Sequence, residues 1–185
     1  MSLVRCPTCI LPLSMCVCAL LVEVRSRVPI VVVRHVFEAK KASNTGVLAA
    51  RVVGGRVVDH GLPHVAADLG DLGSAPHLLF PQGAAREWPE PSALVVLDGT
   101  WSQARTMRSR VAGVAGLPTL SLEAPEARVR LRAQVERPTG MSTIEAIAGA
   151  LERLDDPEPA AALRRLYEAM SERWLWLRQH PSVRG

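Results

Sequence analysis

The chain has 185 residues, which is enough to bury one hydrophobic core with room for a small appended unit. Hydrophobic residues make up 48% of it and charged residues 22%, a balance typical of a globular protein and not of a disordered one. The formal net charge of +4 is mild, and no apolar run reaches the roughly 18 residues that a membrane-spanning helix needs. We therefore expect a protein with no membrane partner.

All four cysteines lie near the start of the chain, as Cys6-Pro-Thr-Cys9 and Cys16-Val-Cys18. Two such pairs can place four thiolates around one tetrahedral ion, for which Zn²⁺ is the usual choice. Two disulfides are the alternative, but nothing else indicates secretion and the two cysteines of a Cys-x-Cys pair bridge each other poorly. The spacing predicts a structural zinc knuckle over residues 1–24, followed by a main domain over residues 25–185.

The segment 10–22 is apolar enough to resemble a secretory leader. Pro12 and two cysteines interrupt it, and no small-residue cleavage site follows. We therefore expect a cytoplasmic protein.

Short apolar runs alternate with helical patterns along the rest of the chain. Alternation of this kind predicts an α/β fold with a mainly parallel sheet. Strands are predicted at 28–33, 56–58, 77–81, 93–97 and 117–122, and helices at 47–53, 100–111, 142–154 and 157–181.

Asp98 ends the apolar strand 93–97, and Gly99 provides a turn into the following helix. Open α/β sheets bind ligands at such a place, outside the carboxyl ends of their strands. Asp98 and Trp101 are therefore candidate functional residues. From the residues alone the alternative stays open that Asp98 only ties down the turn and Trp101 only fills the core.

Two further segments carry helix-start signals. Ser43-Asn-Thr-Gly46 precedes an apolar helix, a pattern that serves either as a cap or as a site for an anion or carboxylate. Ser142-Thr-Ile-Glu145 is a capping box, and its simple interpretation is helix initiation. His35, at the end of the first strand, is interpreted as a structural histidine.

Arginine dominates the charge between residues 101 and 140, with seven arginines against three glutamates. In Arg128-Val-Arg-Leu-Arg132 the arginines alternate, so that an extended segment would present all three on one face. Such a row suits phosphate contacts, and a solvated edge is the alternative.

Four segments, taken in order, carry a resemblance to a known family. They are Cys6-x2-Cys9 with Cys16-x-Cys18, Arg34-His35-x2-Glu38 leading to Asn44-Thr-Gly46, Asp98-Gly-Thr-Trp101 followed by Gln103-Ala104, and Ser142-Thr-Ile-Glu-Ala146. The set resembles the DTW-domain proteins, which are tRNA-uridine aminocarboxypropyltransferases. The resemblance runs from Cys6 to about Leu154.

This resemblance implies a SPOUT-like α/β fold with a deep trefoil knot near the carboxyl end, a rare exception to unknotted topology. It implies S-adenosylmethionine as co-substrate and tRNA, not DNA, as partner. We expect Asp98 to accept the proton from N3 of a uridine, and Trp101 to pack against the donor so that its γ-carbon faces the base. The residues expected to contact S-adenosylmethionine are Thr45, Leu79, Phe80, Pro81, Trp101, Leu120, Ser142 and Thr143. The residues expected to contact RNA are Arg105, Arg108, Arg128, Arg130 and Arg132.

Two alternatives to this activity remain. One is an RNA methyltransferase of the same fold class that uses the same co-substrate. The other is a non-catalytic RNA-binding module built on the zinc knuckle.

Overall fold

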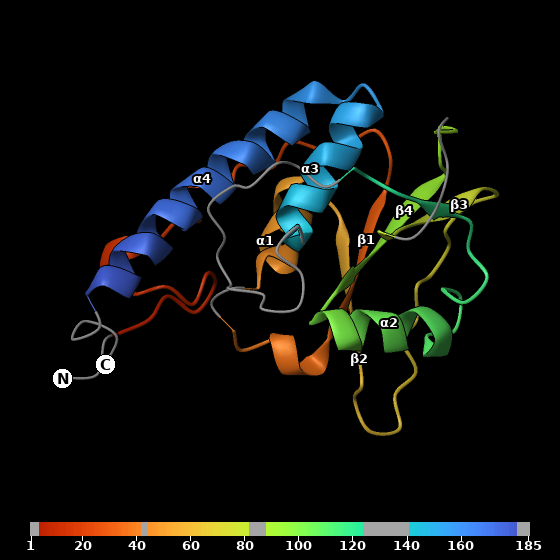
Figure 1. Cartoon of the computed structure of the whole chain (residues 1–185), viewed down its shortest axis with the longest axis horizontal. Coiled ribbons are helices and arrows are strands. Elements are labelled where there is room, and N and C mark those ends of the chain that lie inside the picture. The colour runs from red at the N-terminus through yellow and green to blue at the C-terminus, as the bar shows by residue number, and fades with distance from the viewer. Residues whose placement is uncertain (1–3, 42–43, 82–87, 124–140, 181–185) are drawn as a thin grey trace.

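The computed structural model describes residues 4–41, 44–81, 88–123 and 141–180, in which five strands form one sheet with helices on both faces (Figure 1). The strands are β1 (Ile30–His35), β2 (Arg56–His60), β3 (Pro76–Leu79), β4 (Ala93–Asp98) and β5 (Thr119–Leu120). The helices are α1 (Thr45–Val52), α2 (Trp101–Arg110), α3 (Thr143–Arg153) and α4 (Pro157–Gln179). Three short 3-10 turns are η1 (Leu13–Met15), η2 (Cys18–Leu20) and η3 (Val36–Glu38).

The sheet has the order β2-β1-β4-β3-β5, and every neighbouring pair is parallel. The chain leaves β1 through α1 toward β2 on one side, whereas it leaves β4 through α2 toward β5 on the other side. The adjacent carboxyl ends of β1 and β4 are therefore the topological switch point of the sheet. Open α/β sheets bind ligands at such a point.

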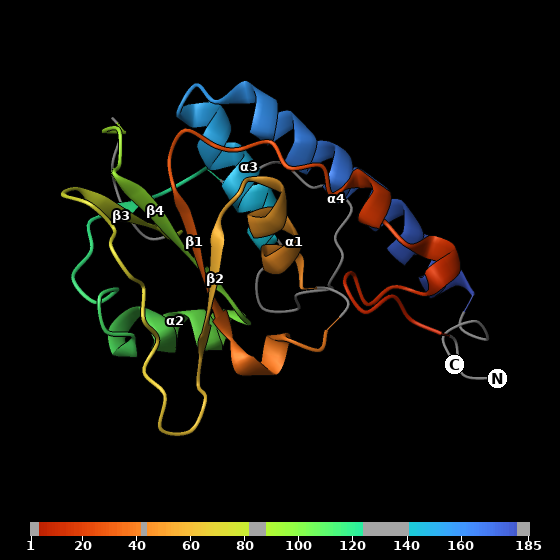
Figure 2. The ribbon, with the colours of Figure 1, turned by 180° about the vertical axis from the view of Figure 1, so that it is seen from behind.

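Helices α1, α3 and α4 cover one face of the sheet and α2 covers the other (Figures 1 and 2). Because successive side chains of a strand point to opposite faces, β1 and β4 contribute to both cores. Ile30, Val32, Leu94 and Val96 join the core under α1, α3 and α4, and Val31, Val33, Val95 and Leu97 join the core under α2.

The cysteine-bearing segment runs along α4 (Figure 2). Its Leu11 and Val17 are fully buried and belong to the same hydrophobic cluster as Leu163 and Leu177 of α4. One core therefore extends from the sheet to the segment that begins with Cys6, while the domain boundary at residue 24 stays a prediction.

The predicted α/β class and parallel sheet are confirmed, with shifts at the element ends. Helix α1 begins at Thr45 and not at residue 47, because the Asn44 side chain accepts a hydrogen bond from the Val47 N–H and caps it. The last predicted strand is reduced to Thr119–Leu120. The segment 124–140 lies outside the described residues, so the trefoil knot stays a prediction.

No helix among the described residues combines the length and the apolarity that a membrane span requires.

Candidate functional site

Asp98 lies at the switch point, on the last residue of β4 and in register with Arg34 of β1. It follows Leu94 and Val96 at two-residue spacing, so its side chain points to the face that α1 and α3 cover. Only 6% of the residue is exposed. A carboxylate buried to this degree needs polar neighbours to offset its desolvation.

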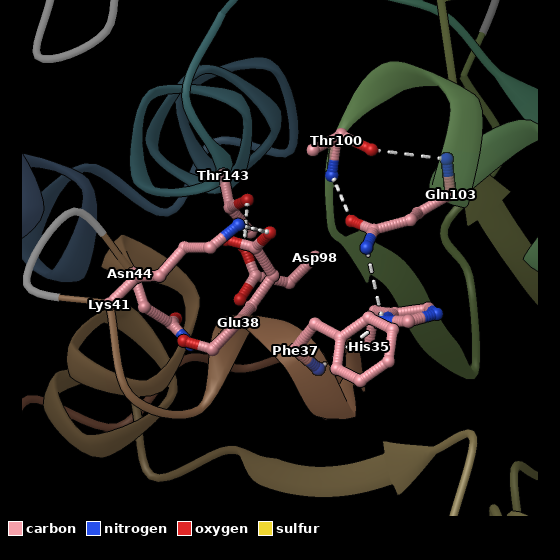
Figure 3. Close-up of polar contacts among 9 residues, drawn as sticks. All are labelled: His35, Phe37, Glu38, Lys41, Asn44, Asp98, Thr100, Gln103 and Thr143. Carbon is pink, nitrogen blue, oxygen red and sulfur yellow. Dashed lines mark hydrogen bonds and ion pairs between the residues drawn. The ribbon is translucent and has the colours of Figure 1, made fainter.

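The neighbours come from the first turns of α1 and α3 (Figure 3). The Thr143 hydroxyl donates a hydrogen bond to Asp98 Oδ1 over 2.6 Å. On the α1 side the backbone at Gly46 approaches so closely that a Cβ built there would lie 2.6 Å from Asp98 Cγ. The N-terminal ends of both helices therefore meet the carboxylate, and their dipoles favour its negative charge.

The same two helix starts also bind each other. The Thr45 hydroxyl accepts a hydrogen bond from the Ile144 N–H over 3.3 Å. Ser142 and Glu145 form the predicted capping box, in which the Ser142 N–H donates to Glu145 Oε2 over 2.9 Å. Ser142 and Thr45 were both expected to contact S-adenosylmethionine. In this structure their hydrogen bonds fix the two helix starts beside Asp98.

Glu38 and Lys41 complete the polar group beside Asp98 (Figure 3). Glu38 is 2% exposed, and its Oε1 lies 2.7 Å from Lys41 Nζ. The Asn44 side-chain amide donates to the Glu38 carbonyl over 3.0 Å, which joins η3 to the start of α1. Glu38 and Lys41 were not among the predicted site residues, and the only sequence signal for them was the position of Glu38 in the Arg34-His35-x2-Glu38 segment.

Charged and polar groups also tie the neighbouring strand ends together. Arg34 makes two hydrogen bonds to Asp59 of β2, with Nε 2.6 Å from Oδ1 and Nη2 2.8 Å from Oδ2. This pairing, with a smaller contribution from Asp98, raises the pKa of Arg34. Arg34 is thus held in its charged form by Asp59, in register with Asp98 on the neighbouring strand.

His35 connects β1 to the turn that follows Asp98 (Figure 3). Its Nδ1 accepts hydrogen bonds from the Phe37 N–H over 3.3 Å and from the Gln103 side-chain amide over 3.2 Å. Gln103 Oε1 in turn accepts from the Thr100 N–H over 2.7 Å. Burial, with a smaller electrostatic contribution from His60, lowers the pKa of His35 below its ordinary value of 6.5, so the ring is neutral at pH 7 and can accept these bonds.

An aromatic group flanks β4 on the α2 side. The Trp101 ring stacks on the buried Phe80 ring, with centroids 5.3 Å apart and planes inclined by 17°. The Arg108 guanidinium lies over Phe80 at 4.9 Å from its centroid. Because Asp98 points to the α1 and α3 face, a ligand that touches both Asp98 and Trp101 has to lie across the end of β4.

The remaining expected site residues are distributed as follows. Leu79 and Leu120 are buried next to each other in paired strands, in the core under α1, α3 and α4. Pro81 and Arg105 are exposed. Arg128, Arg130 and Arg132 lie outside the described residues.

The four cysteines gather as their spacing predicts, and all four are free thiols. Their Sγ atoms lie within 4.8 Å of one another, with 3.5 Å between Cys6 and Cys18 and 3.8 Å between Cys9 and Cys16. Zn–S bonds of about 2.3 Å give a tetrahedron with edges of about 3.8 Å. The group therefore fits a zinc ion with four thiolate ligands.

The surroundings of the thiols differ. Backbone N–H groups of Cys9 and Thr8 lower the pKa of Cys6 to about 6. Burial raises the pKa of Cys18 to about 12. A bound Zn²⁺ ion would deprotonate the thiols that coordinate it, as a coordinated metal generally does.

Replacing Cys9 by serine tests the metal group. We expect the purified wild type to hold about one zinc per chain by elemental mass spectrometry and Cys9→Ser to hold almost none. Loss of a structural metal is expected to cost at least about 2 kcal/mol, or a fall in Tm of about 4–8 °C in a chain of this length. Wild-type protein prepared with zinc in the medium and found free of metal would contradict the assignment.

Replacing Gly46 by alanine tests the contact between α1 and Asp98. The added Cβ would lie 2.7 Å from Asp98 Oδ2, so the helix or the carboxylate has to move. We expect a loss of about 1–3 kcal/mol in unfolding free energy by denaturant titration. Gly149→Ala in α3 is the matched control, because its Cβ would meet the flexible ends of two side chains, Leu122 Cδ1 at 3.2 Å and Arg164 Nη2 at 3.7 Å, and no backbone or buried carboxylate. Equal effects of the two substitutions would contradict the proposed constraint.

The whole of this arrangement lies within one match to a known family. The model of the DTW domain matches residues 3–175, which include the cysteine group, the switch point and the start of α3. No solved structure gives a significant match to the chain. The match covers nearly all of the sequence, and the chain therefore belongs to the DTW domain family.

Proposed function

We propose that this protein transfers the 3-amino-3-carboxypropyl group of S-adenosylmethionine to N3 of a uridine in tRNA, in the cytoplasm. Membership of the DTW family supports a tRNA-related function, and the proposal names the reaction within that role. The observation that carries it is the position of Asp98, a buried carboxylate at the point of the sheet where α/β proteins bind ligands.

In the proposed step, uridine N3 attacks the γ-carbon of the methionine arm. The N3–carbon bond forms while the sulfur–carbon bond breaks, and its electron pair stays on sulfur as methylthioadenosine leaves. The imide proton of N3 goes to the Asp98 carboxylate, which has to come within hydrogen-bond reach of it. The alternative role for Asp98 is to orient the imide without taking its proton.

Thr143 supports either role by holding one carboxylate oxygen. Its 2.6 Å hydrogen bond directs Asp98 Oδ1 toward α3. Because Asp98 is almost fully buried, its carboxylate has to become exposed before a uridine can bind to it. Thr143, expected from the resemblance to contact the donor, is therefore proposed to position Asp98 as well.

Selectivity for the γ-carbon over the methyl group has to come from how the sulfonium donor is oriented. Trp101 is half-buried and stacked on Phe80, so its ring is held in one orientation. An aromatic face also attracts a positively charged sulfur. We propose that Trp101 holds the donor, together with Thr45, Leu79, Phe80, Pro81, Leu120, Ser142 and Thr143.

Arginines near this edge are proposed to contact tRNA phosphates. Arg105 is exposed and Arg108 half-exposed on α2, the helix that begins with Trp101. Contacts of this kind position an RNA without reading its sequence. The same role is proposed for Arg128, Arg130 and Arg132, and the zinc knuckle is proposed to be structural.

The experiment combines tRNA, S-adenosylmethionine and the variant Asp98→Asn. If Asp98 is the base, transfer falls by about 10²–10⁴-fold, because an amide cannot accept the imide proton. If Asp98 only orients the imide, the amide oxygen can still accept that hydrogen bond and much of the activity remains. The readouts are mass spectrometry of the tRNA nucleosides, release of methylthioadenosine, and binding of S-adenosylmethionine by calorimetry.

Asp68→Asn is the matched control, since Asp68 is exposed and its Oδ1 accepts a hydrogen bond from the Gly70 N–H that asparagine can also accept. A methyl group on the product would identify the methyltransferase alternative instead. RNA binding with no affinity for S-adenosylmethionine would identify the non-catalytic alternative.

A further inference from the structure

Phe37 is the most exposed large apolar side chain of the described residues, at 72%. The other phenylalanine, Phe80, is buried at 3%. Phe37 lies in η3, directly after β1, at the same edge of the sheet as Asp98. A large aromatic ring that stays in water lacks the stabilisation of about 1.5–3 kcal/mol that burial would give it. An exposed phenylalanine next to a candidate site is therefore a candidate for binding a partner.

The local structure holds this ring in place. The Phe37 N–H donates to His35 Nδ1, and the next residue, Glu38, is buried and paired with Lys41 (Figure 3). Within η3 the Glu38 side chain is buried and paired with Lys41, and the side chain of its neighbour Phe37 points outward. The ring is presented by a fixed turn and not by a free loop.

The surroundings of Phe37 are aromatic and basic. Its ring lies 5.1 Å from the His35 ring with a tilt of 51°, and His35 in turn lies edge-on to His60 at 6.2 Å. Lys40 and Lys41 follow in the chain and are both exposed. The exposed Phe37 ring can take a flat partner, and Lys40, which follows it next to the Lys41–Glu38 pair, favours a negatively charged one.

We propose that Phe37 is a stacking platform for an unpaired base of the RNA substrate, with Lys40 contacting the adjoining phosphate. Aromatic side chains next to basic ones bind single-stranded RNA in this way, because every base has a flat face. A protein partner would favour a larger apolar surface than one ring among histidines and lysines. The inference rests on the proposed function in one respect, which is that RNA binds at the edge of the sheet where β1 and β4 end.

The test measures binding of unmodified tRNA by fluorescence anisotropy at fixed salt, without S-adenosylmethionine. Phe37→Leu keeps an apolar side chain but removes the ring, and we expect roughly 5- to 100-fold weaker binding. Phe37→Trp keeps a flat ring and should bind as well as the wild type or better. In that variant, RNA binding should quench indole fluorescence more than in the wild type, because a base stacks on the new ring.

Trp176→Leu is the matched control, because Trp176 is, with Phe37, one of the two exposed large apolar aromatic side chains of the described residues, 39% exposed, and lies near the end of α4. It should leave tRNA affinity unchanged. Equal tRNA affinity of Phe37→Leu and wild type would overturn the stacking role, and so would the absence of extra quenching in Phe37→Trp. Transfer activity with unchanged binding in Phe37→Leu would leave the proposed function standing. Loss of affinity in Phe37→Leu without any transfer by the wild type would leave the stacking role standing.

Discussion

The contact of two helix starts with the carboxylate of Asp98 is the constraint on which this edge of the protein depends. Gly46 lets α1 approach the end of β4, and Thr143 attaches α3 to the same side chain. The Thr45 hydroxyl then joins the two helices. Burying a carboxylate is unfavourable unless hydrogen bonds and positive charge surround it, so the Asp98 site and the packing of α1 and α3 are formed together.

Around this contact, the edge of the sheet where the strands end carries three groups of side chains. Asp98 with its polar partners lies toward α1 and α3, the stacked Phe80 and Trp101 rings lie toward α2, and Phe37 faces solvent on η3. Gln103 and His35 connect the start of α2 to the end of β1. These groups lie at one edge of the sheet but are held in place by different layers of the fold, and the proposed donor and nucleobase would bind next to one another there. The cysteine group packs with α4 in the core under α1, α3 and α4, and its closed set of four thiols fits a structural role.

Local patterns were sufficient wherever a few consecutive residues decide the outcome. The apolar run before Asp98 predicts a buried inner strand, and all six residues of β4 are buried. The Ser142-to-Glu145 box predicts the start of α3, because both of its hydrogen bonds span only three residues. The cysteine spacing predicts the thiol group for the same reason, since all of its ligands lie within thirteen residues. Element ends were less accurate, as for β5, whose length depends on its pairing with β3.

The sequence by itself thus determined the α/β class, the parallel sheet, the cysteine group and the place of Asp98 at a strand end. Only the tertiary structure decided the strand order, which makes β1 and β4 neighbours, and the meeting of residues 45–46, 98 and 143. It also decided that Glu38 is buried while Phe37 is exposed. The physical reason is that the contacts among residues 45–46, 98 and 143 join segments about fifty to a hundred residues apart. Which segments meet is decided by the packing of whole helices against the sheet, and no short stretch of sequence contains that information.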